Sequence, residues 1–195
     1  MLRVNGLKLL NGKEISFEIK NGEALFLEGA NGSGKSLLLK SLARLIPSSW
    51  TQVTFRAQDI STFPVELWRS KVLYLPPDVI FDPELTVEEF LEEPFAFSLY
   101  KGFKKVFEPR KYLDLAQDQM QVLSSGQKQS VALLRAISLN PDVLLLDEPF
   151  SHMDSQKREL FFGLLSQWCK DGKMLVIVSH IEVDLAGIHI QKIVL

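Results

Sequence analysis

The stretch ALFLEGANGSGKSLLLKSLARLI, residues 24–46, decides the fold of this chain. It reads as a buried strand, a glycine-rich turn and a leucine-lined helix that Pro47 stops. The turn at 29–36 matches the pattern G-x-x-x-x-G-K-[ST], in which glycines let successive backbone N–H groups curl around phosphate oxygens. Lys35 supplies a charge for the β- and γ-phosphates, and Ser36 offers a hydroxyl to Mg²⁺. A chance match is the alternative, but strand, turn and helix follow in the required order, so we predict a nucleoside triphosphate site. Its expected nucleotide contacts are Gly29, Asn31, Gly32, Ser33, Gly34, Lys35 and Ser36.

Strands and helices alternate on both sides of this stretch. Residues 2–19 form two short alternating runs around Asn11-Gly12, which indicates a hairpin. Further apolar runs predict strands at 51–55, 71–75, 142–148 and 174–180, and a helix at 155–170. Buried-type strands that alternate with helices predict an α/β core around a largely parallel sheet. Residues 78–122 differ, with an acidic run, six phenylalanines between 81 and 107 and a basic KGFKK, and we interpret them as a helical insertion.

Two carboxylates end the apolar run at 142–148. Asp147 at the end of the strand can hold Mg²⁺ beside Ser36, directly or through water. Glu148, one residue further, can polarise a water molecule against the γ-phosphate. Acidic residues also end strands for structural reasons, but a phosphate loop in the same chain favours the catalytic interpretation.

Two polar positions follow these carboxylates along the chain. His180 ends the strand run 174–180 at the expected carboxyl edge of the sheet, where ligand sites of α/β proteins gather. An imidazole there can donate to the γ-phosphate and orient water, although a lone histidine is more often structural. Asp154 follows a Ser-His-Met turn and is a candidate N-cap of the next helix. The predicted catalytic set is therefore Lys35, Glu148 and His180.

The polar octapeptide LSSGQKQS, residues 123–130, precedes an apolar helix pattern that runs from Val131 onward. Hydroxyls, a glycine and amides at a helix start can simply cap the helix. Alternatively, the exposed N–H groups and hydroxyls await an anion, because a helix N-terminus is a ready phosphate site. The octapeptide alone does not distinguish the two interpretations.

These pieces, in this order, resemble the nucleotide-binding domain of ABC transporters. GANGSGKS is similar to the Walker A motif, LSSGQ to the family signature (usually LSGGQ), and VLLLDEP to Walker B with its catalytic glutamate. SHMD resembles the D-loop, which makes Asp154 a candidate nucleotide contact, and His180 resembles the switch histidine. The resemblance implies ATP and Mg²⁺ as ligands. It also implies that Ser124, Ser125, Gly126 and Gln127 contact the γ-phosphate held by a partner's Walker A motif.

The resemblance extends to architecture and partners. It implies one domain, 1–195, with a P-loop NTPase core and mainly parallel sheet, an N-terminal antiparallel β subdomain and a short helical subdomain at about 78–138. Two such subunits would pair head-to-tail, as a homodimer, around two ATP molecules. Hydrolysis would drive an integral-membrane permease, which would hold the chain on the inner face of the cell membrane. The phenylalanines of the insertion fit a permease groove or the subdomain's own core.

Three positions depart from the family pattern. Pro77 and Asp78 stand where the family usually has a glutamine that senses Mg²⁺, so Asp78 becomes a candidate metal ligand or a solvated turn residue. The adenine-stacking aromatic is replaced by Leu9 or Leu10. Ser130 occupies a position where arginine is common.

Composition restricts the function further. A net charge of -2 does not favour a broad nucleic-acid-binding surface. The lone Cys169 fits a reducing compartment, and no apolar run has signal-peptide or membrane-span character, so we expect a cytoplasmic protein. The competing functions are a soluble ABC-type ATPase without transport, a partner that binds ATP but hydrolyses it poorly, and, least favoured, a P-loop small-molecule kinase.

Overall fold

An antiparallel sheet forms the N-terminal part of the computed structural model, which describes residues 1–96 and 118–195. Its strands are β1 (Leu2–Lys8), β2 (Glu14–Ile19), β4 (Gln52–Phe55) and β5 (Gln58–Asp59), in the order β2-β1-β4-β5. The predicted hairpin is confirmed, since β1 and β2 pair antiparallel with Leu2 opposite Ile19. Their register shifts between Val4 and Leu7, where Gly6 has φ +61° and a Cβ would lie 2.5 Å from Oγ1 of Thr51.

A second, five-stranded sheet forms the centre of the molecule. It has the order β6-β7-β8-β3-β9, and every neighbouring pair is parallel. The strands are β3 (Ala24–Glu28), β6 (Val72–Leu75), β7 (Val143–Asp147), β8 (Met174–Val178) and β9 (Ile190–Val194). The α/β core with a mainly parallel sheet is thereby confirmed. Because the strands are parallel, their carboxyl ends meet at one edge, where such sheets place their ligands.

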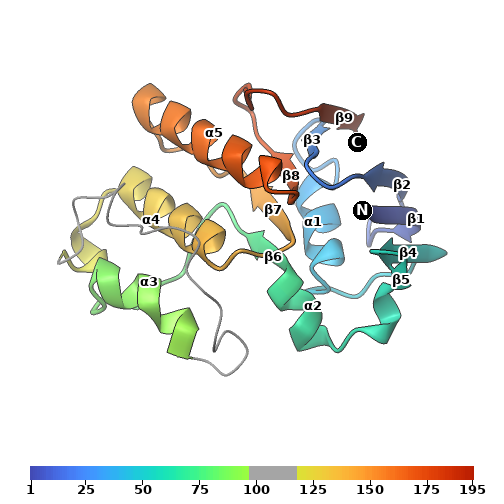
Figure 1. The fold of residues 1–195 in the computed structure, drawn as a ribbon, viewed down its shortest axis with the longest axis horizontal. Coiled ribbons are helices and arrows are strands. Elements are labelled where there is room, and N and C mark those ends of the chain that lie inside the picture. Colours follow the sequence, from blue (N-terminus) through green and yellow to red (C-terminus); the bar gives the residue numbers. More distant parts are fainter. Residues whose placement is uncertain (97–117) are drawn as a thin grey trace.

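Alternate residues of the central strands enter two separate cores. Leu25, Leu145 and Val176 pack on one face with α1 (Lys35–Leu42) and the inner side of the antiparallel sheet. On the other face, Phe26 and Leu144 pack with α4 (Ser125–Ser138) and α5 (Ser155–Lys170). Figure 1 shows the resulting order: antiparallel sheet, α1, parallel sheet, then α4 and α5.

A third apolar cluster lies outside these two cores. It joins α3 (Val87–Ala96), the short 3₁₀ turn at Met120–Val122 and Val131 of α4. Phe90, 3% exposed, is at its centre, so this one of the six phenylalanines serves the insertion's own core. Phe97, Phe103, Phe107 and the KGFKK run lie outside the described residues, and the subdomain limits of 78–138 stay a prediction.

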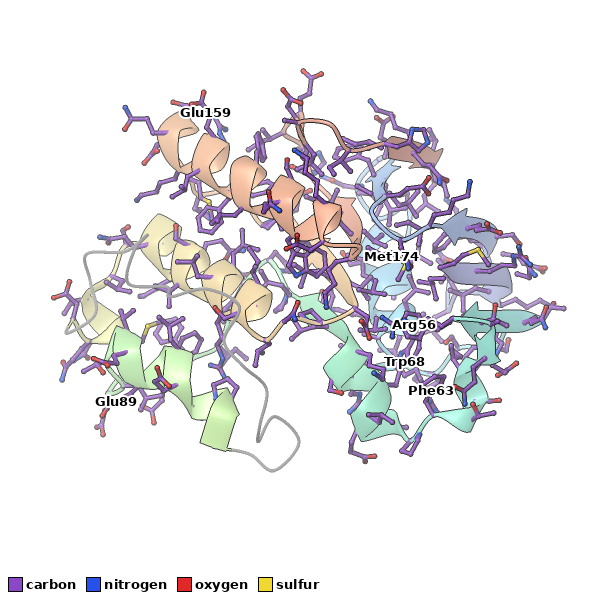
Figure 2. The ribbon with its side chains drawn as sticks, viewed as in Figure 1. Arg56, Phe63, Trp68, Glu89, Glu159 and Met174 are labelled. Atoms are coloured by element: carbon purple, nitrogen blue, oxygen red, sulfur yellow. The ribbon has the colours of Figure 1, made fainter. Side chains whose placement is uncertain are left out.

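An aromatic corner supports the edge of the molecule next to β4. The helix α2 (Val65–Lys71), which the sequence analysis did not predict, places Trp68 with no exposed surface between Phe55 and Phe63. The ring centroids lie 5.8 and 5.7 Å from that of Trp68, and its indole Nε1 donates to Leu42 O at 2.7 Å. Figure 2 shows Phe63 and Trp68 side by side. This bond caps the end of α1, which stops at Leu42, five residues before the proline expected to stop it.

The amino edge of the parallel sheet carries an ionic cluster. Asp142 Oδ1 accepts from Arg56 at 2.7 Å, while Lys71 and Lys173 lie 3.5 and 3.8 Å from the same carboxylate. Burial lowers the pKa of Lys173, and the negative charge of Asp142 offsets part of that effect. Arg56 follows β4, whereas Asp142 precedes β7, so the cluster joins the two sheets.

Within 1–96 and 118–195 no helix is long and apolar enough to cross a membrane.

Candidate active site

The loop between β3 and α1 has the backbone that its glycines predict. Gly29, Gly32 and Gly34 have φ of +143°, +79° and +110°, which L side chains rarely adopt. A Cβ on Gly34 would also lie 2.7 Å from Nδ2 of Asn11, so the hairpin tip approaches this loop closely. Lys35 is buried and donates from Nζ to Gly29 O at 2.6 Å and to Ala30 O at 3.1 Å. The loop is therefore preshaped, with its lysine held against its own carbonyls.

The hairpin between β1 and β2 forms one side of the phosphate loop. Asn11 Nδ2 donates to Ser33 O at 3.3 Å, which connects the hairpin turn to the loop. Of the two leucines predicted to contact a base, Leu9 is 4% exposed and belongs to the core, so that half of the prediction is corrected. Leu10 is 64% exposed and is the one available for a ligand.

Asp147 lies where β7 ends and is only 2% exposed. Its Oδ2 accepts a hydrogen bond of 2.9 Å from the hydroxyl of Tyr74 on the adjacent strand β6. Burial, followed by the charge of Asp147 and this bond, raises the pKa of Tyr74 well above its ordinary value. Tyr74 belongs to none of the motifs in the sequence, although it is the one polar side chain in the otherwise aliphatic strand VLYL.

Glu148 and His180 form a close pair at the ends of neighbouring strands. Glu148 has φ +50°, and its N–H donates to Val178 O at 2.9 Å. Its Oε2 accepts from the backbone N–H of His180 at 3.1 Å, and its Oε1 lies 3.4 Å from His180 Nε2. The side chain of His180 is 63% exposed and that of Glu148 20%, so the imidazole reaches the surface and the carboxylate lies below it.

A cleft of about 290 Å³ brings most of these residues together. Two buried side-chain oxygens in its lining, Ser33 Oγ and Glu148 Oε1, have no hydrogen-bond partner in the described structure. Such atoms fit a polar ligand, because buried polar groups are nearly always hydrogen-bonded. The lining consists of Asn31, Gly32, Ser33, Gly34, Lys35, Ser36, Leu37, Pro77, Asp147, Glu148, Val178 and His180.

The polar side chains of the cleft are suited to hold Mg²⁺ that is also bound to a nucleotide, and are too few to hold a metal ion by themselves. Among the described residues, no three His, Cys, Asp or Glu side chains gather as a metal site. Mg²⁺ usually needs only one or two protein ligands plus phosphate oxygens and water, and Ser36 and Asp147 supply them in the cleft. Asp78, the third predicted ligand, is exposed and outside the cleft lining, whereas its neighbour Pro77 lines it.

The signature-like segment opens α4 instead of preceding it. Ser124 is the N-cap, and its Oγ accepts from the N–H of Gln127 while Gln127 Oε1 accepts from the N–H of Ser124. The helix thus begins at Ser125, six residues before the apolar pattern. Ser124, Ser125, Gly126 and Gln127 do not line the cleft of their own chain.

The loop after Glu148 lies against this helix start. A Cβ on Gly126 would lie 2.2 Å from His152 O, so only glycine allows the approach. Asp154 caps α5, since its Oδ1 accepts from the N–H of Lys157 at 2.8 Å. Asp154, which is also a predicted nucleotide contact, does not line the cleft of its own chain.

A second, larger hollow of about 450 Å³ adjoins the cleft and shares Lys35 and His180 with it. Its lining combines apolar side chains such as Phe26, Val183 and Ile190 with the charged side chains of Glu28 and Lys192. It lacks Ser36, Asp147 and Glu148, so the smaller cleft is the one with the groups that phosphate chemistry needs.

Sequence comparison relates the chain to known transport proteins. The sequence profile of the ABC transporter family matches residues 12–151. A molybdate/tungstate import ATP-binding protein of Pyrococcus abyssi is 32% identical over 181 residues, covering 88% of this chain and 52% of that protein. A putative ABC transporter ATP-binding protein of Caldanaerobacter subterraneus is 33% identical, covering 93% of this chain and 79% of that one. The chain spans about half the length of the first of these relatives.

Solved structures agree with the fold. A dimeric bacterial ABC transporter cassette superposes with a TM-score of 0.79 at 27% identity, covering 100% of this chain and 94% of that one. A post-hydrolysis state of the same cassette, bound to ADP and Pi, gives a TM-score of 0.76 at 28% identity, covering 93% and 88%. A putative ABC transporter ATP-binding protein of Pyrococcus furiosus, at 22% identity, gives 0.78 over 98% and 96%, which concerns the fold alone.

Proposed function

The chain belongs to the ABC transporter family, and from this premise we propose that it binds ATP with Mg²⁺ and hydrolyses it to power transport. The observation that carries the proposal is the position of Glu148. Its carboxylate lies in a cleft with a phosphate loop, fixed by the N–H of His180 and directly after the buried Asp147.

Each group in the cleft has a distinct task in this reaction. The loop N–H groups and Lys35 hold the β- and γ-phosphates, which requires Lys35 Nζ to leave the carbonyls of Gly29 and Ala30. Glu148 accepts a proton from the attacking water, and His180 donates to the γ-phosphate. Bound Mg²⁺, with Ser36 and Asp147 as its protein contacts, would neutralise charge on the phosphates.

A second copy of the chain would complete the site. Ser124, Ser125, Gly126 and Gln127 open α4 outside their own chain's cleft. The capping box uses the N–H groups of Ser124 and Gln127, so those of Ser125 and Gly126 are the ones available to another chain's γ-phosphate. Asp154, on the loop packed against Gly126, would approach the same ligand. The 27% identical cassette described as dimeric supports the pairing of two copies. The head-to-tail arrangement of this homodimer is our proposal and rests on the position of the α4 start outside its own chain's cleft.

The permease partner would dock at the helical subdomain, which we place at about residues 78–138. A groove of about 340 Å³ lies there between β6, the loop after it, α3 and α4. Ile80, 96% exposed, is in its lining, as an anchor for an apolar partner would be. Relatives include ATP-binding proteins of manganese transport and of molybdate/tungstate import, which supports a role in transport through such a partner at the inner face of a membrane.

Replacing Glu148 with Gln tests the proposal. The variant keeps the shape of the side chain but cannot accept a proton, so ATP should still bind, hydrolysis should fall at least a hundredfold, and an ATP-bound dimer should accumulate. Size-exclusion chromatography with ATP and phosphate release measure the two effects. Glu159→Gln, the same change on the exposed face of α5, is the matched control. Normal turnover by Glu148→Gln would contradict the assignment of the base.

A partner that binds ATP but hydrolyses it poorly remains the second candidate, because Pro77 lines the cleft without a side-chain donor. In that case the wild-type chain would form the ATP-bound dimer as readily as Glu148→Gln. Co-purification with a membrane protein separates both candidates from a soluble ATPase without a transport role.

A further inference from the structure

The hydrogen bond between Tyr74 and Asp147 connects the edge strand of the parallel sheet to the cleft. The two residues are 73 positions apart, and their distance of 2.9 Å lies within the range of O–H···O hydrogen bonds. Tyr74 lies opposite Leu145 in the register of β6 and β7, so its ring extends along β7 toward the strand end that Asp147 occupies.

Asp147 needs such a partner because it is almost completely buried. A buried carboxylate without hydrogen bonds is strongly disfavoured, and its side chain would rotate to find a donor. Tyr74 occupies Oδ2, which leaves Oδ1 for the cleft that Asp147 lines.

The residues between Tyr74 and the predicted magnesium site contribute no comparable side-chain donor to Asp147. The residues that follow Tyr74 are Leu75, Pro76 and Pro77, none of which has a side-chain donor, and Asp78 is exposed. Of the described residues on β6 and the loop to Asp78, Tyr74 is the one whose side chain has a hydrogen bond to a residue of the cleft lining.

We propose that Tyr74 is a positioning residue for the magnesium site: its hydroxyl fixes the Asp147 carboxylate so that Oδ1 is presented to the metal. The inference rests on the proposed function, since it assumes that Mg²⁺ enters the cleft with a nucleotide. Tyr74 itself touches neither metal nor nucleotide and acts only through Asp147.

Tyr74→Phe removes the hydroxyl and keeps the ring. Its test uses the full chain with a non-hydrolysable ATP analogue and Mn²⁺ as the metal probe, whose binding is followed by electron paramagnetic resonance. The apparent Mn²⁺ dissociation constant should rise about tenfold, because a hydrogen bond to a charged group is lost. Affinity for the analogue in EDTA should change less than about twofold. Ser138→Ala, which removes a buried hydroxyl bonded to Leu134 O on α4, is the control and should change neither.

A double-mutant cycle with Asp147→Asn identifies the route of the effect. If Tyr74 acts through the carboxylate, adding Tyr74→Phe to Asp147→Asn should cause no further loss of Mn²⁺ affinity. Two results would overturn the inference: an equal loss of Mn²⁺ affinity in both backgrounds, or an unchanged Mn²⁺ affinity with a lower melting temperature. Tyr74 would then only link β6 to β7. Failure of the wild-type chain to bind the analogue would instead overturn the proposed function, and the inference with it.

Discussion

Glu148 adopts a left-handed backbone conformation, with φ +50°, that costs a non-glycine residue about 1–2 kcal/mol. Two hydrogen bonds hold it there, from its N–H to Val178 O and from the N–H of His180 to its Oε2. Both partners lie at the end of β8, so the turn that ends β7 folds the carboxylate back over the sheet edge. Glu148 is thereby held in the cleft that the phosphate loop also lines.

Leu10 governs base recognition in our interpretation, because it is the exposed leucine at the hairpin tip. An aliphatic side chain lacks the stacking contact of an aromatic ring, worth about 1–1.5 kcal/mol. GTP should therefore compete with ATP within about tenfold, and Leu10→Phe should tighten purine nucleotide binding by up to about tenfold. Competition against a fluorescent ATP analogue measures both.

Leu45→Phe, at an exposed leucine beyond the far end of α1, is the control for added aromatic surface. A wild-type preference for ATP above about a hundredfold would mean that another group reads the base.

Motif spacing was sufficient to locate the residues that line the cleft. Lys35, Ser36, Asp147, Glu148 and His180 are all there, because each lies at or beyond the carboxyl end of a strand of one parallel sheet, and parallel strands end together. Their chemical roles stay predictions. Tyr74 could not be found in this way, since its contact depends on the register of β6 against β7 and no motif encodes that register.

The start of α4 is an element whose position depends on a single glycine. Gly126→Ala would bring a methyl group to 2.2 Å from His152 O, which is backbone and cannot rotate away. The helix or the loop must then shift, which should destabilise the fold by about 1–3 kcal/mol and weaken the ATP-bound dimer. Urea unfolding and size-exclusion chromatography measure these two effects.

Gly163→Ala is the matched control, because Gly163 lies inside α5 and a Cβ there meets nothing within 4 Å. That change should stabilise the chain by about 0.5–1 kcal/mol. Equal losses from both substitutions would show that the close approach to His152 has no special importance.

Helix ends were harder to predict than helix existence. The apolar pattern placed a helix after Val131, but the capping box of Ser124 and Gln127 starts it at Ser125. The pattern also extended α1 toward Pro47, but Arg44 turns left-handed with φ +54° and donates to Ile60 O and Phe63 O. In both cases a local polar contact, invisible to hydrophobic periodicity, sets the boundary.

At the scale of the whole molecule, Asp142 joins the two sheets by pairing with cations from both. Asp142→Asn would leave Arg56, Lys71 and Lys173 without their carboxylate, in a site where burial already lowers the pKa of Lys173. We expect a loss of about 2 kcal/mol in the free energy of unfolding, measured in urea.

Glu18→Gln breaks an exposed pair with Arg3 and should change the same free energy by less than about 1 kcal/mol. A loss from Asp142→Asn no larger than that of the control would mean that the two sheets are held together by their apolar core alone.

The aromatic corner around Trp68 has an optical consequence. All three tryptophans of the chain, at 50, 68 and 168, are outside the cleft lining, and two of them are packed in the interior. Their ultraviolet emission should therefore be blue-shifted in the folded chain and move to the red on unfolding. Addition of nucleotide to a single chain should leave that emission nearly unchanged. Intrinsic fluorescence will therefore report unfolding well and nucleotide binding poorly.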